Sequence, residues 1–190
     1  AMVAGLDEAG RGACAGPLYA AAVILAPQPR IAELADSKLL TPKARDRVEQ
    51  RVKRLAMAWA VASIDVAELD AVGLHRANLL AFRRAWLRLP LIPDYALCDG
   101  FVPGGLCRPE LAVWKGDQVS ATIAAASVLA KTARDRHMDL LDAQYPEYGF
   151  AEHKGYTTPA HRDALHEHGP SPVHRFRFIT VRRALREGAA

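Results

Sequence analysis

The sequence predicts an α/β protein in which helices flank a mixed central sheet. Three observations support this fold class. Short apolar runs that stop at glycine, proline or acidic residues predict strands, mostly in the first half of the chain, and apolar residues at three- and four-residue steps predict helices. The composition, 51% hydrophobic and 24% charged, is that of an ordinary globular protein. The 190 residues fit one domain, 1–190, and any separate part would begin after Tyr145-Pro146.

The chain is predicted to open with a β-hairpin. Residues 2–6 form a short apolar run that stops at Asp7-Glu8, and residues 18–25 form a second run with proline on either side. The turn between the two runs consists mainly of glycine and alanine. These two strands would therefore begin the sheet.

A first helix is predicted to start at Pro42, because Thr41 before it is a good N-cap and proline is favoured at the first helical position. Its buried stripe is expected at three positions: Val48, Val52 and Leu55. A strand over residues 57–64 is expected to follow.

The remainder of the chain is predicted to be mainly helical, with two short strands at 95–98 and 111–114. Helices are expected over four ranges: 74–89, 119–144, 159–168 and 180–187. The helix over 119–144 has an alanine-rich face that would let it pack close to the sheet. Inward-facing residues of the first range include Phe82, Trp86 and Leu87, and all three tryptophans are expected to pack in the core.

The charge of the chain points to a polyanionic partner. The formal net charge is +4, with a pI near 9.1. From residue 173 onward there are five arginines and one acid, Glu187: Arg175, Arg177, Arg182, Arg183 and Arg186. Such a basic tail suits nucleic acid, although a solvated helix end explains it equally well. No apolar run of about 18 residues and no secretory segment is seen, so we expect no membrane span and a cytoplasmic location.

The cysteines and histidines give no signal for a metal or redox motif. Three cysteines without a Cys-x-x-Cys spacing favour reduced thiols: Cys14, Cys98 and Cys107. Five histidines crowd the segment 153–174, but no cysteine lies among them, which favours surface histidines over a zinc site. Acids at four- and three-residue steps on the long helix favour a solvated face with i,i+4 ion pairs: Asp135, Asp139 and Asp142.

The most informative pattern is acidic. Three predicted strands end at acids, which gives a set of four carboxylates: Asp7, Glu8, Asp99 and Asp117. If these strands are neighbours, the carboxylates converge, and unit charges about 4 Å apart repel by about 4 kcal/mol at an effective dielectric near 20. Two divalent ions would relieve this repulsion, and oxygen-only ligands suit Mg²⁺ or Mn²⁺. Such a pair of ions is suited to phosphodiester hydrolysis.

Simpler explanations exist for each acid taken alone. Asp99-Gly100 is an ordinary turn dipeptide, and Gly116-Asp117 could begin the long helix. Two functional alternatives also remain: a non-catalytic duplex-binding module that uses only the basic tail and the glycine-rich turn, and a metal-dependent nuclease with another class of substrate. Only the hydrolases need four convergent acids.

Several segments in the right order resemble the type 2 ribonuclease H family (bacterial ribonuclease HII). The segment 5–12, GLDEAGRG, is similar to the opening motif of that family. Further similar segments lie at 36–38 (DSK), 98–100 (CDG), 115–117 (KGD) with Ser120, 124–131 (AAASVLAK), 134–135 (RD) and 153–156 (HKGY). The resemblance extends over nearly the whole chain. Cys98 departs from it, since the family often has a branched aliphatic residue there.

The resemblance implies a ribonuclease H-like fold with a small C-terminal helical region, about 146–190, that helps bind substrate. It implies an endonuclease that cleaves the RNA strand of RNA/DNA hybrids and nicks duplex DNA 5′ of a single embedded ribonucleotide. Two Mg²⁺ or Mn²⁺ ions, bound by the four carboxylates, would leave 5′-phosphate and 3′-hydroxyl ends. A monomer is expected, and no clear clamp-binding peptide is seen at the C-terminus.

The resemblance also implies a set of substrate-binding residues. The turn Gly10-Arg11-Gly12 would approach the ribose and contact the 2′-hydroxyl that marks RNA. Tyr156 would stack on the sugar of the following nucleotide and favour deoxyribose there, and Lys38 would contact a phosphate near the scissile bond. The arginine-rich tail would grip the duplex backbone without reading its sequence.

Overall fold

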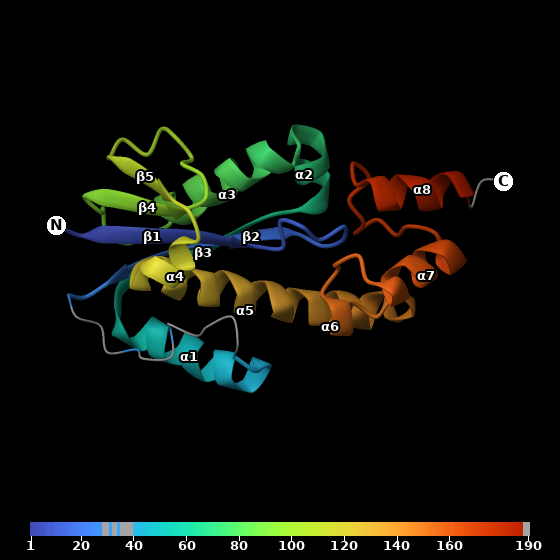
Figure 1. Cartoon of the computed structure of the whole chain (residues 1–190), viewed down its shortest axis with the longest axis horizontal. Helices are drawn as coiled ribbons and strands as arrows, with labels where there is room; N and C mark the ends of the chain where they lie inside the picture. Colours follow the sequence, from blue (N-terminus) through green and yellow to red (C-terminus); the bar gives the residue numbers. More distant parts are fainter. Residues whose placement is uncertain (28–30, 32–33, 35–39, 188–190) are drawn as a thin grey trace.

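The computed structural model describes residues 1–27, 31, 34 and 40–187 and has the predicted α/β architecture. A five-stranded mixed sheet has the order β3-β2-β1-β4-β5 (Figure 1). Its strands are β1 Val3–Ala9, β2 Leu18–Leu25, β3 Ala56–Ile64, β4 Tyr95–Asp99 and β5 Glu110–Val113. The predicted opening hairpin is confirmed, because β1 and β2 are antiparallel, whereas β4 runs parallel to β1.

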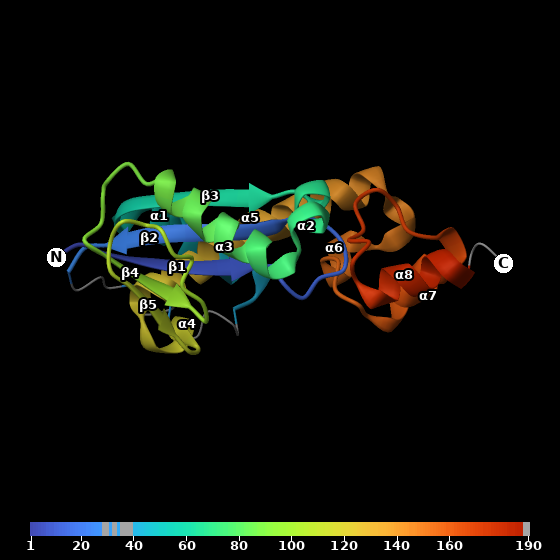
Figure 2. The same cartoon turned by 90° about the horizontal axis from the view of Figure 1, so that it is seen from above.

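Helices cover both faces of the sheet (Figures 1 and 2). On one face lie α1 Pro42–Leu55 and α5 Ala121–Gln144, and on the other lie α2 Val66–Val72 and α3 Leu74–Leu87. The α5 helix approaches β1 so closely that a Cβ added at Gly5 would lie 2.2 Å from the Thr122 carbonyl carbon. Glycine at position 5 and the buried alanines of α5 therefore allow this contact.

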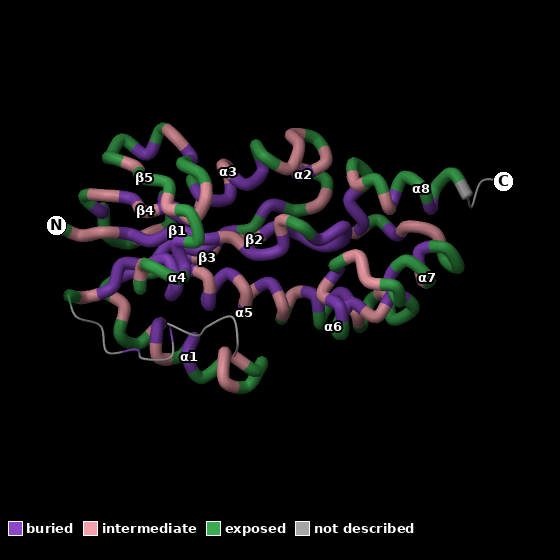
Figure 3. Tube along the Cα trace, in the orientation of Figure 1, coloured by how far each residue is buried: buried purple, intermediate pink, exposed green. Residues whose placement is uncertain are grey.

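The central strands β1 and β2 are buried between the two helical layers, whereas the edge strands β3 and β5 keep exposed residues (Figure 3). One apolar cluster fills the α3 side, with Leu6, Ile64 and Phe82 among its members, and a second fills the α5 side, with Val23 and Leu129. Because both faces of β2 are buried, this strand is a continuous apolar run without polar alternation. None of the helices within the described ranges combines the length and apolar character needed to cross a bilayer.

The C-terminal helices pack around the far end of α5, beyond the sheet (Figure 2). They are the 3₁₀ helix η2 Pro146–Tyr148, α6 Phe150–His153, α7 Pro159–His168 and α8 Ile179–Glu187. A third apolar cluster unites them with the long helix: Met138, Leu141, Tyr148, Phe150, Leu165 and Val181. The α5 helix thus joins the C-terminal region to the sheet.

Two buried arginines tie the loop between β1 and β2 to the C-terminal region. Arg134 of α5 is fully buried and donates hydrogen bonds to the carbonyl oxygens of Pro17, Ala15 and Lys154 at 2.8–3.0 Å. Arg175 is also fully buried and donates to the carbonyl oxygens of Gly16 and Arg11. Arg175 was expected to grip a duplex with the other tail arginines, and its burial shows that it instead supports the protein interior.

Several burial expectations are wrong for reasons of tertiary packing. Leu55 and Leu87 are 40% and 79% exposed, because each lies in the last turn of its helix, past the end of the packed face. Trp59 and Trp114 are 37% and 81% exposed, whereas Trp86 is buried as expected. The short helices α2 and α6 have too few residues for a clear periodic pattern and were not predicted.

The histidines of the C-terminal segment were expected on the surface, and for three of them this is wrong. They form a buried cluster: His153, His161 and His174. The His161 and His174 Nε2 atoms lie 3.0 Å apart, so one ring donates a hydrogen bond and the other accepts it. Burial lowers the pKa of His161 to about 4 and that of His174 to about 3. Both rings are therefore neutral at pH 7.

This histidine pair predicts acid sensitivity of the C-terminal helices. The unfolded chain binds protons near pH 6.5 while the folded pair does not, so stability present above pH 6.5 is lost as the pH falls toward 4. Hydrogen-exchange protection factors of α7 amides should fall between pH 6.5 and 4.5, measured against the amides of α3 in the same sample. Equal changes in the two helices would contradict this expectation.

Candidate active site

The four predicted carboxylates lie on adjacent elements at one region of the sheet. Asp7 and Glu8 are inside β1, and Asp99 is the last residue of the neighbouring strand β4. Asp117 lies in the short helix α4 Gly116–Val119, which follows β5. The sequence placed Asp7 and Glu8 after the first strand. In the structure this strand continues through both acids, because they pair with Ala21 and Ala20 of β2.

The strand geometry sends Asp7 and Glu8 to opposite faces of the sheet. Asp7 is buried on the α5 side, where Ser127 supplies a hydrogen bond. Glu8 lies toward α3, where Asn78 Nδ2 donates to Glu8 Oε2 at 3.5 Å. Asn78 is a site residue that sequence reasoning missed, since a lone asparagine in a helix carries no distinctive signal.

Asp99 is fixed by the start of α4. Its Oδ1 accepts a hydrogen bond of 2.6 Å from the backbone N–H of Gly116. A Cβ on Gly116 would lie 2.5 Å from the Ile123 Cδ1 atom and 3.3 Å from Asp99 Oδ1, so a larger residue here would have to displace the Ile123 side chain. The hydrogen bond holds the chain segment that carries Asp117 next to the end of β4.

The electrostatics of the site are those of crowded acids. Burial and the charge of Glu8 raise the pKa of Asp7 well above its ordinary value, and Asp99 adds to the effect. Burial also raises the pKa of Glu8 to about 7, with a contribution from Asp99, although Arg11 and the hydrogen bond from Asn78 oppose the rise. The folded chain therefore holds negative charge here at a cost that a cation would offset.

The donor set fits hard divalent ions, because it consists of carboxylate oxygens alone. Three of the acids, Glu8, Asp99 and Asp117, line one cavity of about 170 Å³. Within the described part of the chain, however, no three His, Cys, Asp or Glu side chains are grouped as a ready-made metal cage. Asp7 does not line this cavity, because it points to the other face of the sheet.

A second cavity, of about 330 Å³, adjoins the first and also includes Glu8 in its lining. The turn residues Gly10, Arg11 and Gly12 form one side of it and Tyr156 forms another, so the fold brings together segments about 145 residues apart. Gly10 has φ +88°, and a Cβ there would lie 1.8 Å from Arg134 Nε. This glycine is therefore required both by its backbone conformation and by the buried guanidinium beside it.

Arg11 and Tyr156 both line this second cavity. Arg11 Nη1 is buried, and among the described residues it has no hydrogen-bond partner. Tyr156 is 40% exposed, with the Arg134 guanidinium 5.6 Å from its ring centroid. Lys38, the remaining predicted substrate contact, lies outside the described residues.

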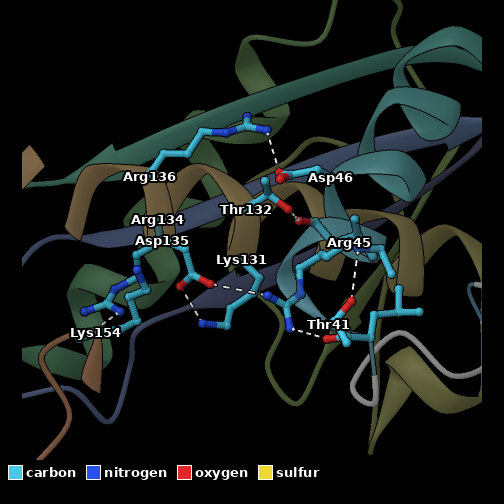
Figure 4. A network of polar contacts seen from close by, with 12 residues as sticks. Thr41, Arg45, Asp46, Lys131, Thr132, Arg134, Asp135, Arg136 and Lys154 are labelled. Carbon is cyan, nitrogen blue, oxygen red and sulfur yellow. Dashed lines mark hydrogen bonds and ion pairs between the residues drawn. The ribbon is translucent and has the colours of Figure 1, made fainter. Parts of the chain in front are cut away.

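Two further lining residues of the second cavity, Arg45 and Lys131, belong to a polar network that the sequence only partly predicted (Figure 4). Asp135 forms ion pairs with Lys131, four residues earlier on α5, and with Arg45 of α1. The i,i+4 pair was expected, whereas the contact with α1 depends on tertiary packing. Lys131 and Arg45 both line the cavity, so its wall offers positive charge close to Glu8.

These features together define an α/β nuclease of the ribonuclease H type, with acids toward the C-terminal ends of adjacent strands beside a glycine-turn cavity. The family model described as Ribonuclease HII matches residues 4–181. A Ribonuclease HII from Salinispora tropica is 59% identical over 182 residues, covering 95% of this chain and 67% of the relative. One from Nocardioides sp. is 56% identical over 184 residues, covering 96% and 77%. The chain belongs to the ribonuclease HII family.

A solved structure agrees with this assignment. The ribonuclease H2 of Pyrococcus horikoshii has a TM-score of 0.83 at 26% identity, and the match covers 100% of this chain and 98% of that one. The predicted ribonuclease H-like fold is therefore confirmed. Membership of the family makes the chain a hydrolase with ribonuclease H endonuclease activity, in a family that depends on divalent metal ions.

Proposed function

We propose that this enzyme cleaves the RNA strand of RNA/DNA hybrids and also nicks duplex DNA 5′ of a single embedded ribonucleotide, leaving 5′-phosphate and 3′-hydroxyl ends. One observation carries the proposal: Glu8 lines both the acidic cavity and the cavity formed by the glycine turn and Tyr156. A nucleotide recognised in the second cavity would therefore have its 5′ phosphate at the carboxylates. The enzyme would act as a monomer.

The roles of the residues follow from their chemistry. Four carboxylates would hold two divalent ions, Mg²⁺ or Mn²⁺: Asp7, Glu8, Asp99 and Asp117. Ions bound in this way lower the pKa of water and offset charge on phosphodiester oxygens. Backbone groups of the turn 10–12 would hydrogen-bond the ribose 2′-hydroxyl, because glycine permits close approach. Arg11, which lines the second cavity and lies beside Glu8, would hold a phosphate oxygen.

The C-terminal region would contribute charge without sequence preference. Four of its five tail arginines are exposed: Arg177, Arg182, Arg183 and Arg186. These side chains can reach a phosphate backbone, whereas Arg175 cannot, because it is enclosed by the loop it supports. Lys38 is proposed to contact a phosphate near the scissile bond.

The direct test offers three duplexes in parallel: an RNA/DNA hybrid, a DNA duplex with one ribonucleotide, and an all-DNA duplex of the same sequence. With Mg²⁺ or Mn²⁺ we expect cleavage of the first two only, and a single cut 5′ of the ribonucleotide in the second. Equal cleavage of the all-DNA duplex would reject recognition of the 2′-hydroxyl. Absence of all cleavage would favour a duplex-binding module.

The role of Tyr156 gives a separate prediction. Tyr156→Ala should lower cleavage at a single ribonucleotide about tenfold or more, while cleavage of the hybrid falls less. Only the single-ribonucleotide duplex needs the following deoxyribose to stack on the ring. Tyr156→Phe keeps the ring and should retain the preference. Both are measured as kcat/KM on the two substrates. Equal losses on both would remove the sugar-stacking role.

A further inference from the structure

We infer that Trp114 contacts the nucleic-acid strand on the 5′ side of the scissile phosphate, opposite the side held by Tyr156. This inference rests on the proposed function, because it uses the position of the scissile bond at the carboxylates. It assigns a role to a side chain that lies outside the glycine turn, the four acids and the basic tail.

The exposure of Trp114 is unusual for a residue with so large an apolar surface. Its side chain is 81% exposed, whereas Trp86 is 8% exposed and packs in the core. An indole ring that stays in water contributes none of the folding free energy that its burial would provide. Trp114 shares its cavity with the exposed ring of Phe101 and with three of the acids, and exposed apolar side chains gathered at such a site favour a ligand that covers them.

The backbone around Trp114 is anchored beside the acids. It directly follows β5, whose Val113 accepts a hydrogen bond from the Gly100 N–H at the end of β4. Lys115 after it adopts the left-handed conformation, φ 51°, and leads into the hydrogen bond between Gly116 and Asp99. The backbone on both sides of Trp114 is thus anchored to the strand that carries Asp99, which fixes the position of its Cα beside the acids.

The surroundings of the ring favour nucleic acid over an apolar protein surface. Trp114 and Phe101 line the cavity of Glu8, Asp99 and Asp117. The Arg11 guanidinium lies 4.6 Å from the Phe101 ring centroid, and exposed Lys115 is next to Trp114. An aromatic ring with neighbouring cations is the combination that proteins use to hold single strands and sugar–phosphate backbones.

The two cavities fix the side of the scissile bond that Trp114 faces. Glu8 lines both, Tyr156 lines only the larger one, and Trp114 lines only the smaller one. If the ribonucleotide and its 3′ neighbour occupy the larger cavity, the strand that passes Glu8 and continues 5′ must enter the smaller one. Of the two aromatic side chains that line the smaller cavity, Trp114 is the more exposed to this upstream strand, because Phe101 is 38% exposed.

The experiment compares two labelled duplexes, each with the same ribonucleotide and the same full-length complement, bound in EDTA so that no cleavage occurs. One has a continuous upstream strand, and in the other the strand begins at the ribonucleotide. Trp114→Ala should weaken binding of the first duplex about tenfold, the size of effect that stacking on one aromatic ring supplies, and of the second less than twofold. Trp114→Phe should stay within about threefold of the wild type on both, because it keeps an aromatic ring.

Trp59→Ala is the matched control, because Trp59 is a partly exposed indole on β3, at the opposite edge of the sheet. This variant should bind both duplexes as the wild type does. Equal losses for Trp114→Ala on the two duplexes, or no loss on either, would overturn the inference. Cleavage of the first duplex by the wild type with Mn²⁺ tests the proposed function separately. Its failure is therefore distinguishable from failure of the Trp114 contact.

Discussion

Asp7→Asn is expected to lower turnover on both substrates about a thousandfold or more while leaving the fold intact. A divalent ion at a phosphodiester contributes several kcal/mol to transition-state stabilisation, and each 1.36 kcal/mol changes the rate about tenfold. Asparagine keeps the shape of Asp7 but removes one of the charges that would attract the ion. Steady-state cleavage of the hybrid and of the single-ribonucleotide duplex measures the loss.

The same substitution should have the opposite effect on the stability of the metal-free protein. The pKa of Asp7 is raised by burial and by Glu8, so the ionised form destabilises the fold. Its favourable contribution is present below the ordinary pKa of aspartate, near 4, and is lost as the pH rises through the raised value. Asp7→Asn should therefore melt at or above the wild-type temperature at pH 8 in EDTA, and the difference should shrink at pH 5.

Two comparisons make the Asp7 result decisive. Mg²⁺ or Mn²⁺ at pH 8 should raise the melting temperature of the wild type more than that of Asp7→Asn, because bound ligand stabilises the folded state by mass action. Asp139→Asn is the matched control, since Asp139 is an acid on α5 whose partner is Lys154 in the C-terminal region. A large loss of stability in Asp7→Asn, with normal turnover by the folded fraction, would give Asp7 a structural role instead.

The sequence predicted the parts of the fold that depend on local chemistry. The strand 18–25, the helix start at Pro42 after its Thr41 cap, and the helix 159–168 agree with the structure in their bounds. Each has a strong local signal, either an apolar run between prolines or a capping residue followed by proline. Burial at helix ends and the buried histidine cluster depend on which elements pack together, and no local pattern carries that information.

In the candidate site too, the sequence predicted the identity of most residues but not their arrangement, which depends on tertiary packing. The four acids, the glycine turn and Tyr156 could be selected from motifs, because the family resemblance assigns residues one by one. Their arrangement in space could not be predicted from the sequence, because the opposite directions of Asp7 and Glu8 depend on β1 continuing through both residues. Asn78, Arg45 and Trp114 were missed as site residues for the same reason: each belongs to the site through tertiary contacts alone.

Arg134→Ala is expected to cause the largest loss of stability of any substitution considered for this chain, about 3–5 kcal/mol, because it leaves buried polar groups without partners and opens a cavity. Three carbonyl oxygens would lose their donor: those of Ala15, Pro17 and Lys154. For a chain of this size the melting temperature should fall by about 10 °C. Arg162→Ala removes an exposed arginine from α7 and should change stability by less than about 0.5 kcal/mol.

Arg134 also connects stability to activity, because its guanidinium occupies the space beside Gly10 and lies next to the Tyr156 ring. Well below its melting temperature, Arg134→Ala should therefore show a higher KM for the single-ribonucleotide duplex, as the turn 10–12 and Tyr156 lose their common support. Arg134→Lys keeps a buried cation but supplies a single donor atom for three carbonyls spread around the guanidinium, so it should recover only part of either property. A variant that melts early yet binds this duplex as the wild type does would show that the turn holds its shape without Arg134, and that the arginine serves the interior alone.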